Sequence, residues 1–199
     1  MKVKEIFYTI QGEGRNAGRP AVFCRFTGCN LWSGLEEDRA TAQCSFCDTD
    51  FNGGDKYTEE ELIDAIDNLW PKGHNNKFVV FTGGEPALQL TSRVIYFLQK
   101  RGFEVSMETN GTIPPPAGYY WRTVSPKAGT PLNVTSGNEL KVVWPQNIDL
   151  SELEKMNFRH RYLQPMDGHP DSLRITLEEV MKRPAWKLSL QTHKILGVR

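Results

Sequence analysis

Apolar and β-branched runs alternate with helical patterns along the chain. The runs that predict strands are Lys4–Ile10, Ala21–Thr27, Phe78–Thr82, Phe103–Glu108, Trp121–Val124, Glu139–Trp144, Arg161–Gln164 and Leu188–Thr192. Several runs are continuously apolar, as at Phe78–Phe81, which is typical of strands covered on both faces. This order of elements favours an α/β architecture with a mostly parallel sheet.

Helical patterns lie between these runs. Thr58 and Glu61 have the spacing of a capping box and predict the beginning of a helix. The residues of this helix that we expect to face inward are Leu62, Ile63, Ile66 and Leu69. Further helices are predicted at Ser92–Arg101, which stops at Gly102, at Leu150–Met156, and at Ser172–Lys182, which is ended by Pro184.

The length of the chain, 199 residues, is that of one domain. The sequence contains neither an internal repeat nor a low-complexity tract, and the proline-rich stretch Ile113–Gly118 is a stiff loop rather than a linker. We therefore expect residues 1–199 to form a single domain. Ligands of such sheets lie at the carboxyl ends of the strands, so site motifs are expected directly after strands.

The charge balance excludes some classes of partner. Twenty-four Lys and Arg residues are matched by 24 Asp and Glu residues. Without a basic excess, direct binding to nucleic acid is not favoured. The N-terminus lacks the apolar run of a signal peptide, and no apolar stretch approaches the thickness of a bilayer. We expect a soluble, cytoplasmic protein that does not bind membranes.

Four cysteines lie in the first quarter of the chain, which indicates metal or redox chemistry rather than disulfides in a cytoplasmic protein. Cys29, Cys44 and Cys47 follow a predicted strand with the spacing C-x14-C-x2-C. Three thiolates on a four-iron cluster leave one iron without a protein ligand, and this open iron is what a chemical role requires.

Two other interpretations of the cysteines stay open. With Cys24 included, the spacing C-x4-C-x14-C-x2-C is similar to a zinc ribbon. Cys24 argues against zinc because it lies in mid-strand, in the alternation Val22, Cys24, Phe26, where a small buried apolar residue is expected. The third interpretation is that all four cysteines are unligated core residues.

A second motif follows the strand Phe78–Thr82. The strand continues into Gly83, Gly84, Glu85 and Pro86. Paired glycines let a ligand approach the main chain closely, although such a turn is also found as a plain connection between a strand and a helix. The order of the two motifs, each placed after a strand, makes the chemical interpretation stronger than either motif alone.

Together these motifs resemble the radical S-adenosylmethionine (SAM) superfamily. In that superfamily the open iron chelates the amino and carboxylate groups of SAM, and the Gly-Gly-Glu-Pro edge holds the methionyl amino group. The usual first gap is C-x3-C, whereas the C-x14-C gap of this chain is similar to one subgroup, the 7-carboxy-7-deazaguanine synthases. The resemblance extends along nearly the whole chain.

The resemblance implies an α/β fold, arranged as a partial TIM-like β/α barrel with a mostly parallel sheet. It implies conversion of 6-carboxy-5,6,7,8-tetrahydropterin to 7-carboxy-7-deazaguanine with release of ammonia, in queuosine biosynthesis and hence tRNA modification. The ring contraction would begin with reductive cleavage of SAM. The implied cofactors are a 4Fe-4S cluster, SAM and Mg²⁺. The implied partners are the pterin, an external electron donor such as flavodoxin, and a second copy in a homodimer.

The resemblance also carries roles to individual residues. The cluster ligands are Cys29, Cys44 and Cys47, and the magnesium ligand is Thr49. Substrate contacts are implied for Ile10, Gln11, Gly12, Glu13, Arg25, Thr82 and the terminal carboxylate of Arg199. SAM contacts are implied for Gly84, Glu85, Ser125, Pro126, Lys127, Gln164, Pro165, Met166 and Asp167. Glu108–Gly111 and Gln191–Lys194 match the family without an assigned role.

The residue types suit these roles. Arg25 points to the opposite face of its strand from Cys24, and its planar fork matches a carboxylate, although a surface ion pair is the plain alternative. Gln11 offers a donor and an acceptor to an amide edge, and Glu13 accepts from N–H groups. Asp48 competes with the neighbouring threonine as a magnesium ligand. For Lys141, which is flanked by apolar residues, a site role and a solvent-reaching edge position both stay open.

Two functions of other classes remain as alternatives. One is a radical SAM activating enzyme, which abstracts hydrogen from a glycine of a partner protein and has no use for the segment Gln11–Glu13. The other is a zinc-stabilised module without catalysis, in which Gly83–Pro86 would be only a turn.

Overall fold

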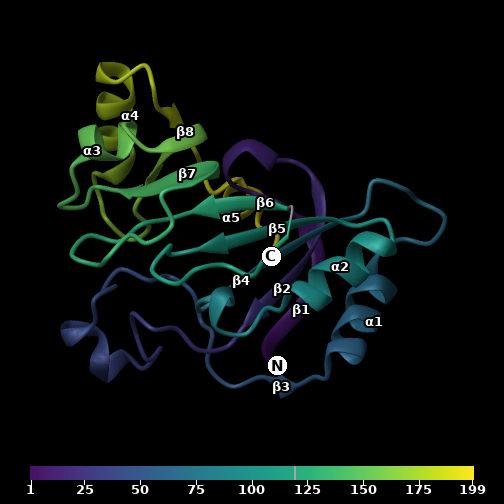
Figure 1. Cartoon of the computed structure of the whole chain (residues 1–199). Coiled ribbons are helices and arrows are strands. Elements are labelled where there is room, and N and C mark those ends of the chain that lie inside the picture. The colour runs from purple at the N-terminus through teal and green to yellow at the C-terminus, as the bar shows by residue number, and fades with distance from the viewer. Residues whose placement is uncertain (119) are drawn as a thin grey trace.

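The computed structural model describes residues 1–118 and 120–199, and a twisted sheet runs through the middle of the molecule (Figure 1). Within the described residues the sheet has nine strands in the order β3-β1-β2-β4-β5-β6-β7-β8-β9. The strands are β1 (Lys2–Ile10), β2 (Pro20–Phe26), β3 (Asp55–Lys56), β4 (Phe78–Gly83), β5 (Glu104–Thr109), β6 (Trp121–Val124), β7 (Ser136–Trp144), β8 (Asn157–Pro165) and β9 (Lys187–Leu188).

From β2 through β9 each strand is parallel to its neighbour, as expected for strands that are joined by helical crossovers. The strand β1 is antiparallel to both β2 and β3. The order is linear, so the sheet is open, with β3 and β9 at its edges. The predicted α/β class with a mostly parallel sheet in an incomplete barrel is confirmed.

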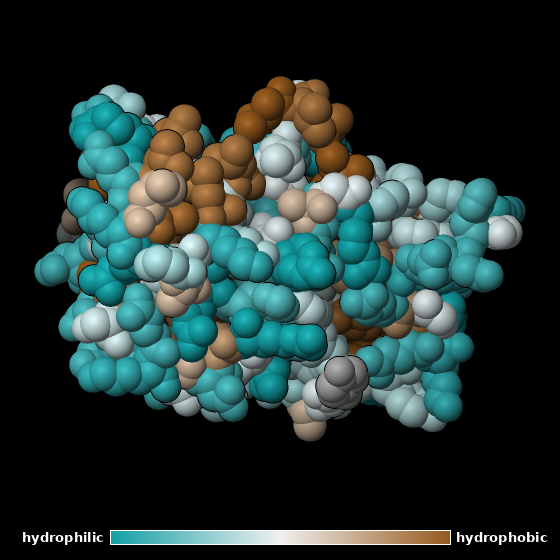
Figure 2. All heavy atoms as spheres, turned by 90° about the horizontal axis from the view of Figure 1, so that it is seen from above, coloured by the Kyte–Doolittle hydropathy of each residue, from teal (hydrophilic) through white to brown (hydrophobic). Residues whose placement is uncertain are grey.

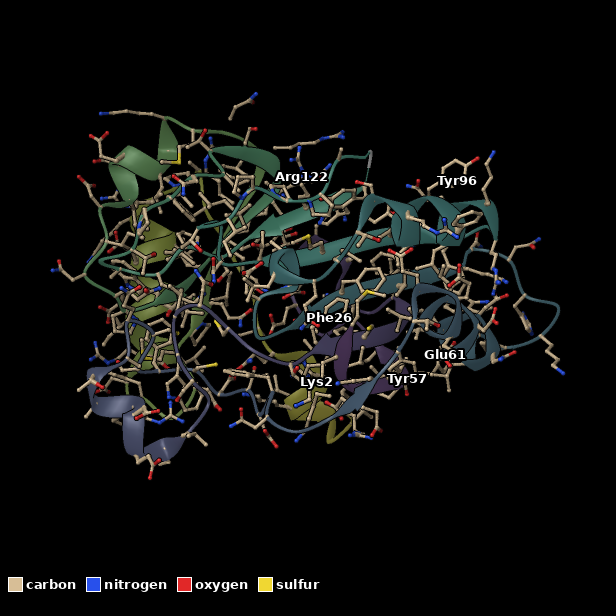
Figure 3. The ribbon with its side chains drawn as sticks, turned by 60° about the horizontal axis from the view of Figure 1, so that its bottom comes forward. Lys2, Phe26, Tyr57, Glu61, Tyr96 and Arg122 are labelled. Atoms are coloured by element: carbon tan, nitrogen blue, oxygen red, sulfur yellow. The ribbon has the colours of Figure 1, made fainter. Side chains whose placement is uncertain are left out.

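Among the described residues there are five helices, and all except the last, near the C-terminus, cover the outer face of the sheet in two groups (Figure 1). They are α1 (Glu59–Leu69), α2 (Ser92–Lys100), α3 (Leu150–Glu154), α4 (Ser172–Lys182) and α5 (Thr192–Leu196), with 3₁₀ turns η1 (Gly14–Asn16), η2 (Glu36–Thr41) and η3 (Pro86–Leu88). One apolar core joins α1 and α2 to β2, β4 and β5. A second core joins α3 and α4 to β6, β7 and β8. In Figure 3, Glu61 marks α1, and Tyr96 on α2 points away from the sheet.

Local sequence signals fix the ends of the first two helices. The Thr58 amide donates to Oε2 of Glu61 over 2.8 Å, and the Glu61 amide donates to Oγ1 of Thr58 over 3.2 Å, so the predicted capping box is confirmed. Gly102 follows α2 with φ +85°, a conformation that favours glycine. The prediction that Leu69 faces inward is wrong, because the helix ends there and Trp70 takes the buried position.

The last part of the chain differs from its prediction. The pattern at 188–192 predicts a strand, but β9 ends at Leu188 and Thr192 begins α5. The reason is a pair of hydrogen bonds, in which the amide and Oγ1 of Thr192 both donate to the carbonyl of Gly12, over 3.0 and 2.9 Å. These bonds draw the chain away from the sheet edge and across to the loop after β1.

Exposed apolar side chains gather on the face shown in Figure 2. Among the large apolar residues that are exposed, α4 contributes Leu173, Leu177 and Met181, and the C-terminal segment contributes Ile195, Leu196 and Val198. Within residues 1–118 and 120–199, none of the helices combines the length and the apolar character that crossing a bilayer requires.

Candidate active site

A row of polar residues crosses the inner face of the sheet. In the strand register, Glu5 is opposite Arg25, and Arg25 is opposite Thr82. The row resumes where Glu108 is opposite Thr123, which is opposite Glu139. Because side chains alternate between the two faces of a sheet, residues at one register position share a face. The buried strands are therefore apolar toward the helices and polar toward the interior of the half-barrel.

This interior is a cavity of about 540 Å³. Of the residues predicted for the site, the cavity wall includes Cys29, Cys44, Cys47 and Thr49, then Ile10, Gln11, Glu13, Arg25, Thr82 and Arg199, and then Gly84, Ser125, Lys127, Gln164, Pro165 and Asp167. Four predicted residues are not part of this wall, namely Gly12, Glu85, Pro126 and Met166. One cavity thus brings together motifs from the whole length of the chain.

The three predicted cluster ligands lie at the cavity, whereas the fourth cysteine does not. Cys24 is fully buried in the core with α1 and α2, and burial raises the pKa of its thiol. A hydrogen bond between the sulfurs of Cys44 and Cys47 raises the pKa of Cys44 and lowers the pKa of Cys47 to about 6. The Leu31 amide donates to the sulfur of Cys29 over 3.4 Å.

The donor set suits a cluster better than a single ion. Among residues 1–118 and 120–199, no group of three or more His, Cys, Asp or Glu side chains converges on one point that could hold a metal ion. A zinc ion needs four ligand atoms within about 2.3 Å of its centre, and Cys24 faces the wrong side of the sheet to supply one. Three cavity-facing thiols are the protein ligands that a four-iron cluster with one open iron requires.

The turn after β4 is fastened to the chain that leads to Cys29, the first of the predicted cluster ligands. The Gly84 amide donates to the Phe26 carbonyl over 3.1 Å, and the Glu85 amide donates to the Gly28 carbonyl over 2.9 Å. A Cβ atom on Gly84 would lie 1.8 Å from that Gly28 oxygen, so glycine is required by the close approach of two main chains.

Glu85 is placed differently from the expectation that it contacts SAM. Its side chain is fully buried, and burial raises the pKa of its carboxyl group. The carboxylate accepts from the hydroxyl of Thr109 and from the amide of Asn110, each over 2.7 Å, and from the amide of Ala87 over 2.9 Å. Glu85 therefore ties the turn after β4 to the end of β5, behind the cavity wall.

A charged network lies deep in the cavity around Lys141 of β7. The ammonium donates to Oε2 of Glu108 over 2.9 Å and to Oε2 of Glu13. Nε2 of Gln11 donates to the other oxygen of Glu108 over 2.9 Å. Burial alone would lower the pKa of Lys141, but Glu108, Glu13 and Glu139 raise it, so the lysine is charged. The structure thus places Lys141 inside the site and not at a solvent edge.

Glu139 lies two residues before Lys141 on the same face of β7. It is almost fully buried, and burial raises the pKa of its carboxyl group to about 7 despite the attraction of Lys141. The amide of Arg15 donates to its Oε2 over 2.9 Å. Glu139 supports the loop after β1 from behind and is not part of the cavity wall.

Arg25 combines the two alternatives that the sequence leaves open. It faces the cavity, and its Nε also donates to Oε1 of Glu5 over 2.9 Å. Arg199 forms an ion pair with the same Glu5. The carbonyl of Arg199 accepts from Oγ1 of Thr9 over 2.6 Å, which holds the C-terminus against β1 at the cavity.

Comparisons with known proteins agree with this arrangement. The profile of the Radical SAM superfamily matches residues 38–119. The 7-carboxy-7-deazaguanine synthase of Burkholderia multivorans is 53% identical over 98% of this chain and 98% of that protein, and the one of Caulobacter vibrioides is 52% identical over the same shares. The chain belongs to the 7-carboxy-7-deazaguanine synthase family. The crystal structure of QueE from Escherichia coli is also similar, with a TM-score of 0.72 and 26% identity over 95% of this chain and 92% of that one.

Family membership decides among the alternatives left by the sequence. A radical SAM family implies a 4Fe-4S cluster and SAM, and the three cavity-facing cysteines with an open fourth position suit that pair of cofactors. A zinc-stabilised module would need Cys24 at the site, and this cysteine is in the core. An activating enzyme would leave the network of Gln11 and Glu13 without a use.

Several cavity residues are not assigned a role by the sequence. They are Glu5, Asp48, Glu108, Lys141, Gln191, His193 and Lys194. In the sequence, Lys141 is conspicuous as a charge between two apolar residues, whereas Glu108 is marked only by its position at the end of a predicted strand. No local signal links Lys194 to Asp48, yet its Nζ donates to Oδ2 of Asp48 over 2.6 Å and to Oδ2 of Asp167 over 2.8 Å. Only the tertiary fold brings these residues together.

Proposed function

We propose that this chain converts 6-carboxy-5,6,7,8-tetrahydropterin to 7-carboxy-7-deazaguanine with release of ammonia, in queuosine biosynthesis. The observation that carries the proposal is the single cavity that joins the cysteine triad to Arg25 and to the network of Gln11 and Glu13. Its volume of about 540 Å³ is in the range of sites for small molecules. The relatives in Burkholderia multivorans and Caulobacter vibrioides carry the name of this synthase.

Cys29, Cys44 and Cys47 would hold the cluster, with one iron left for SAM. Together these cofactors supply the one-electron chemistry that begins the reaction. The turn at Gly84, held close to Gly28, presents main-chain groups to the cofactor side of the cavity. The protein's own contribution here is to fix the two thiol-bearing loops and the glycine turn against one another.

Lys127 would bind a polar part of SAM. Its Nζ donates to the carbonyl and to Oγ of Ser125 over 2.7 and 2.8 Å, so the ammonium is already oriented. Lys127 is half-buried, and burial lowers the pKa of its ammonium although Cys44, Cys47 and Glu85 lie near it and oppose this shift. Gln164 and Asp167, at and after the end of β8, complete this side of the cavity.

The pterin would bind between Arg25 and the Lys141 network. Arg25 lines the cavity, and because its Nε is paired with Glu5, the two terminal nitrogens of its fork would bind the pterin carboxylate. Gln11 and Glu13 present amide and carboxylate groups to the amide edge of the ring. Burial would raise the pKa of Glu13, but Lys141, Gln191 and His193 hold it below its usual value, so Glu13 is ionised and accepts hydrogen bonds.

Thr49 would bind Mg²⁺ together with substrate oxygens. Support comes from Asp48, the competing ligand, whose carboxylate is held by Lys194 and by Nε2 of Gln191, over 2.6 and 3.2 Å. Thr49 lines the cavity, and its hydroxyl donates to Oδ1 of Asp48 over 3.4 Å. Magnesium in proteins typically retains most of its water and takes few protein ligands.

Two further parts of the proposal concern partners. An external donor such as flavodoxin would supply the electron, and the chain would form a homodimer. Both follow from the family resemblance and stay predictions. Dimerisation is tested by sedimentation of the purified protein, and the donor by reduction of the reconstituted protein with purified flavodoxin.

One anaerobic experiment tests the proposed function. The chain is reconstituted with iron and sulfide, reduced and mixed with SAM, and then 5′-deoxyadenosine and deazapurine are measured with and without the pterin and Mg²⁺. We expect deazapurine only when the pterin is present, and more of it with Mg²⁺. Cleavage of SAM without formation of deazapurine would contradict the proposed substrate and product. Tightly bound zinc without any cleavage of SAM would contradict the assignment of the chain as a radical SAM enzyme.

A further inference from the structure

The segment between Cys29 and Cys44 folds into a support for the loop that carries the other two cysteines. This segment contains the 3₁₀ helix η2. The amide of Cys44 donates to the carbonyl of Leu31 over 3.3 Å, so the loop starts beside the beginning of the segment. The long gap in the C-x14-C spacing is thus an ordered structure that packs next to the thiols.

Arg39 of η2 connects this segment directly to the cysteine loop. Its Nη1 donates to the carbonyl of Ser45 and to the carbonyl of Cys47, each over 3.0 Å. The loop lies outside the helices and strands, so its carbonyl groups have no partners from a regular ladder. One guanidinium satisfies two of them, one on each side of Phe46.

The Arg39 side chain is itself held in place from two directions. Its Nε lies 2.7 and 2.8 Å from the two carboxylate oxygens of Glu36. Its guanidinium carbon lies 4.2 Å from the ring centroid of Trp32. A planar guanidinium can stack on a ring and donate at its edges at the same time, which an ammonium cannot do.

Trp32 is a firm base for this contact. It is 7% exposed, its Nε1 donates to the carbonyl of Leu35 over 3.0 Å, and its ring meets Phe51 edge-to-face with centroids 5.5 Å apart. Phe51 is 1% exposed and follows the cysteine loop. Trp32, Arg39 and the main chain at Cys47 therefore form an unbroken series of contacts. The packing of Trp32 against Phe51 fixes the buried end of this series.

We propose that Arg39 is a positioning residue for the iron–sulfur cluster, which acts by fixing the main chain between Cys44 and Cys47. This inference rests on the proposed function insofar as these cysteines hold a cluster. Residues that orient metal ligands from outside typically change metal affinity about 10- to 100-fold when they are replaced. The arginine does not touch a sulfur, so its effect passes through the two carbonyl groups.

The test uses Arg39→Met, Arg39→Lys and, as a matched control, Arg174→Met. Arg174 also pairs with a glutamate one helical turn away, Glu178, but it is exposed on α4. Two readouts are measured on each protein. The first is amide hydrogen exchange of residues 45–48 in the chain without cluster. The second is the rate at which the reconstituted, folded protein loses iron to a chelator, with the electron paramagnetic resonance spectrum of the reduced cluster recorded in parallel.

We expect Arg39→Met to exchange faster at residues 45–48 and to lose iron about 10- to 100-fold faster, with a changed spectrum. Arg39→Lys should show a smaller change of the same kind, because one ammonium cannot replace the fork. Arg174→Met should match the unmodified chain. Should Arg39→Met fail to fold, Arg39→Lys decides the question alone.

Two outcomes separate the inference from the proposed function. If the unmodified chain takes up no cluster, the proposed function fails, and the exchange data still report whether Arg39 holds the loop. If the unmodified chain takes up a cluster and a folded Arg39 variant keeps its iron, spectrum and loop exchange unchanged, the positioning role is overturned and the proposed function stands.

Discussion

Glu108 of β5 and Lys141 of β7 form an ion pair across the intervening strand β6, with 2.9 Å between Oε2 and Nζ. Their side chains are 19% and 5% exposed, so both charges are largely out of water. Glu13 binds the same ammonium from the loop after β1. One cation thus holds two carboxylates that face the proposed pterin, and this arrangement predicts how the site responds to substitution.

Replacing Lys141 with methionine should destabilise the chain without cluster by about 3 to 5 kcal/mol, because Glu13 and Glu108 are left as like charges in a buried place. Urea unfolding measures the loss. Lys155→Met, which removes an exposed ion pair with Glu152, is the control and should show no measurable change.

Lys141→Met also allows a test of whether repulsion between Glu13 and Glu108 causes the loss of stability. Adding Glu108→Gln to Lys141→Met removes one of the two unpaired charges, so part of the lost stability should return. A double variant that is less stable than the single variant would show that the network is not held together by charge.

Replacing Glu139 with glutamine should change the pH dependence of stability. Burial raises the folded pKa of Glu139 to about 7 from an ordinary value of 4.5, so the folded chain keeps a proton that the unfolded chain releases. Through this group, stability is lost as pH rises from 4.5 to 7, by about 3 kcal/mol. Glutamine removes this contribution and still accepts from the Arg15 amide.

Unfolding free energies at about pH 5 and about pH 8 check the Glu139 prediction. The unmodified chain should lose about 2.5 kcal/mol more than Glu139→Gln between these two conditions, because part of the effect is already present at about pH 5. Parallel pH profiles of the two proteins would mean that Glu139 is already ionised at low pH in the folded chain.

The cysteines should fall into two classes. Cys29→Ala should abolish uptake of iron and sulfide, because it removes a ligand at the cavity wall. Cys24→Ala should keep full uptake and cost about 1 kcal/mol of stability, because it removes one buried atom from the core. Iron analysis and the visible absorbance of reconstituted protein measure both; equal loss of iron in the two variants would refute the ligand assignment.

Replacing Lys194 with methionine should lower the Mg²⁺ concentration that gives half of the maximal activity. The substitution removes the ion pair that holds the carboxylate of Asp48 next to Thr49, together with a competing positive charge, and leaves Asp48 only the uncharged partners Gln191 and Thr49. A free carboxylate is a good ligand for this hard cation. Titration of activity with Mg²⁺ tests the idea, and an unchanged or higher half-saturating concentration would place the metal away from this loop. Lys100→Met, on the outer helix α2, is the control.

The parts of the fold that the sequence predicts are those with local causes. The capping box at Thr58 and the glycine that ends α2 need only a few neighbouring residues, and both are confirmed. The strand Trp121–Val124 and the helix Ser172–Lys182 are observed with the predicted bounds. The start of α5 at Thr192 has a distant cause, the carbonyl of Gly12, and no local pattern reveals it.

The residues of the site divide in the same way, into those with a local signal in the sequence and those that only the fold brings together. Cys29 and Gly84 follow strands directly, and their spacing is visible in one dimension. Lys194 and Asp48 are separated by 146 positions and share no pattern, so only the fold shows their contact. Lys141 is intermediate: a charge flanked by apolar residues is conspicuous in the sequence, but whether it meets solvent or buried carboxylates depends on the register of β5 and β7.

The reversed direction of β1 has a consequence for how this scaffold could be altered. Ile10 pairs with the first residue of β2, so the loop after β1 enters the half-barrel from the amino edge, whereas the cysteines and the glycine turn approach from the carboxyl edge. In the proposed function, the pterin contacts of Gln11 and Glu13 and the cluster ligands would thus come from opposite edges of the sheet. A library confined to residues 11–19 would therefore vary one wall of the proposed pterin site and leave the cysteine loops and the glycine turn unchanged.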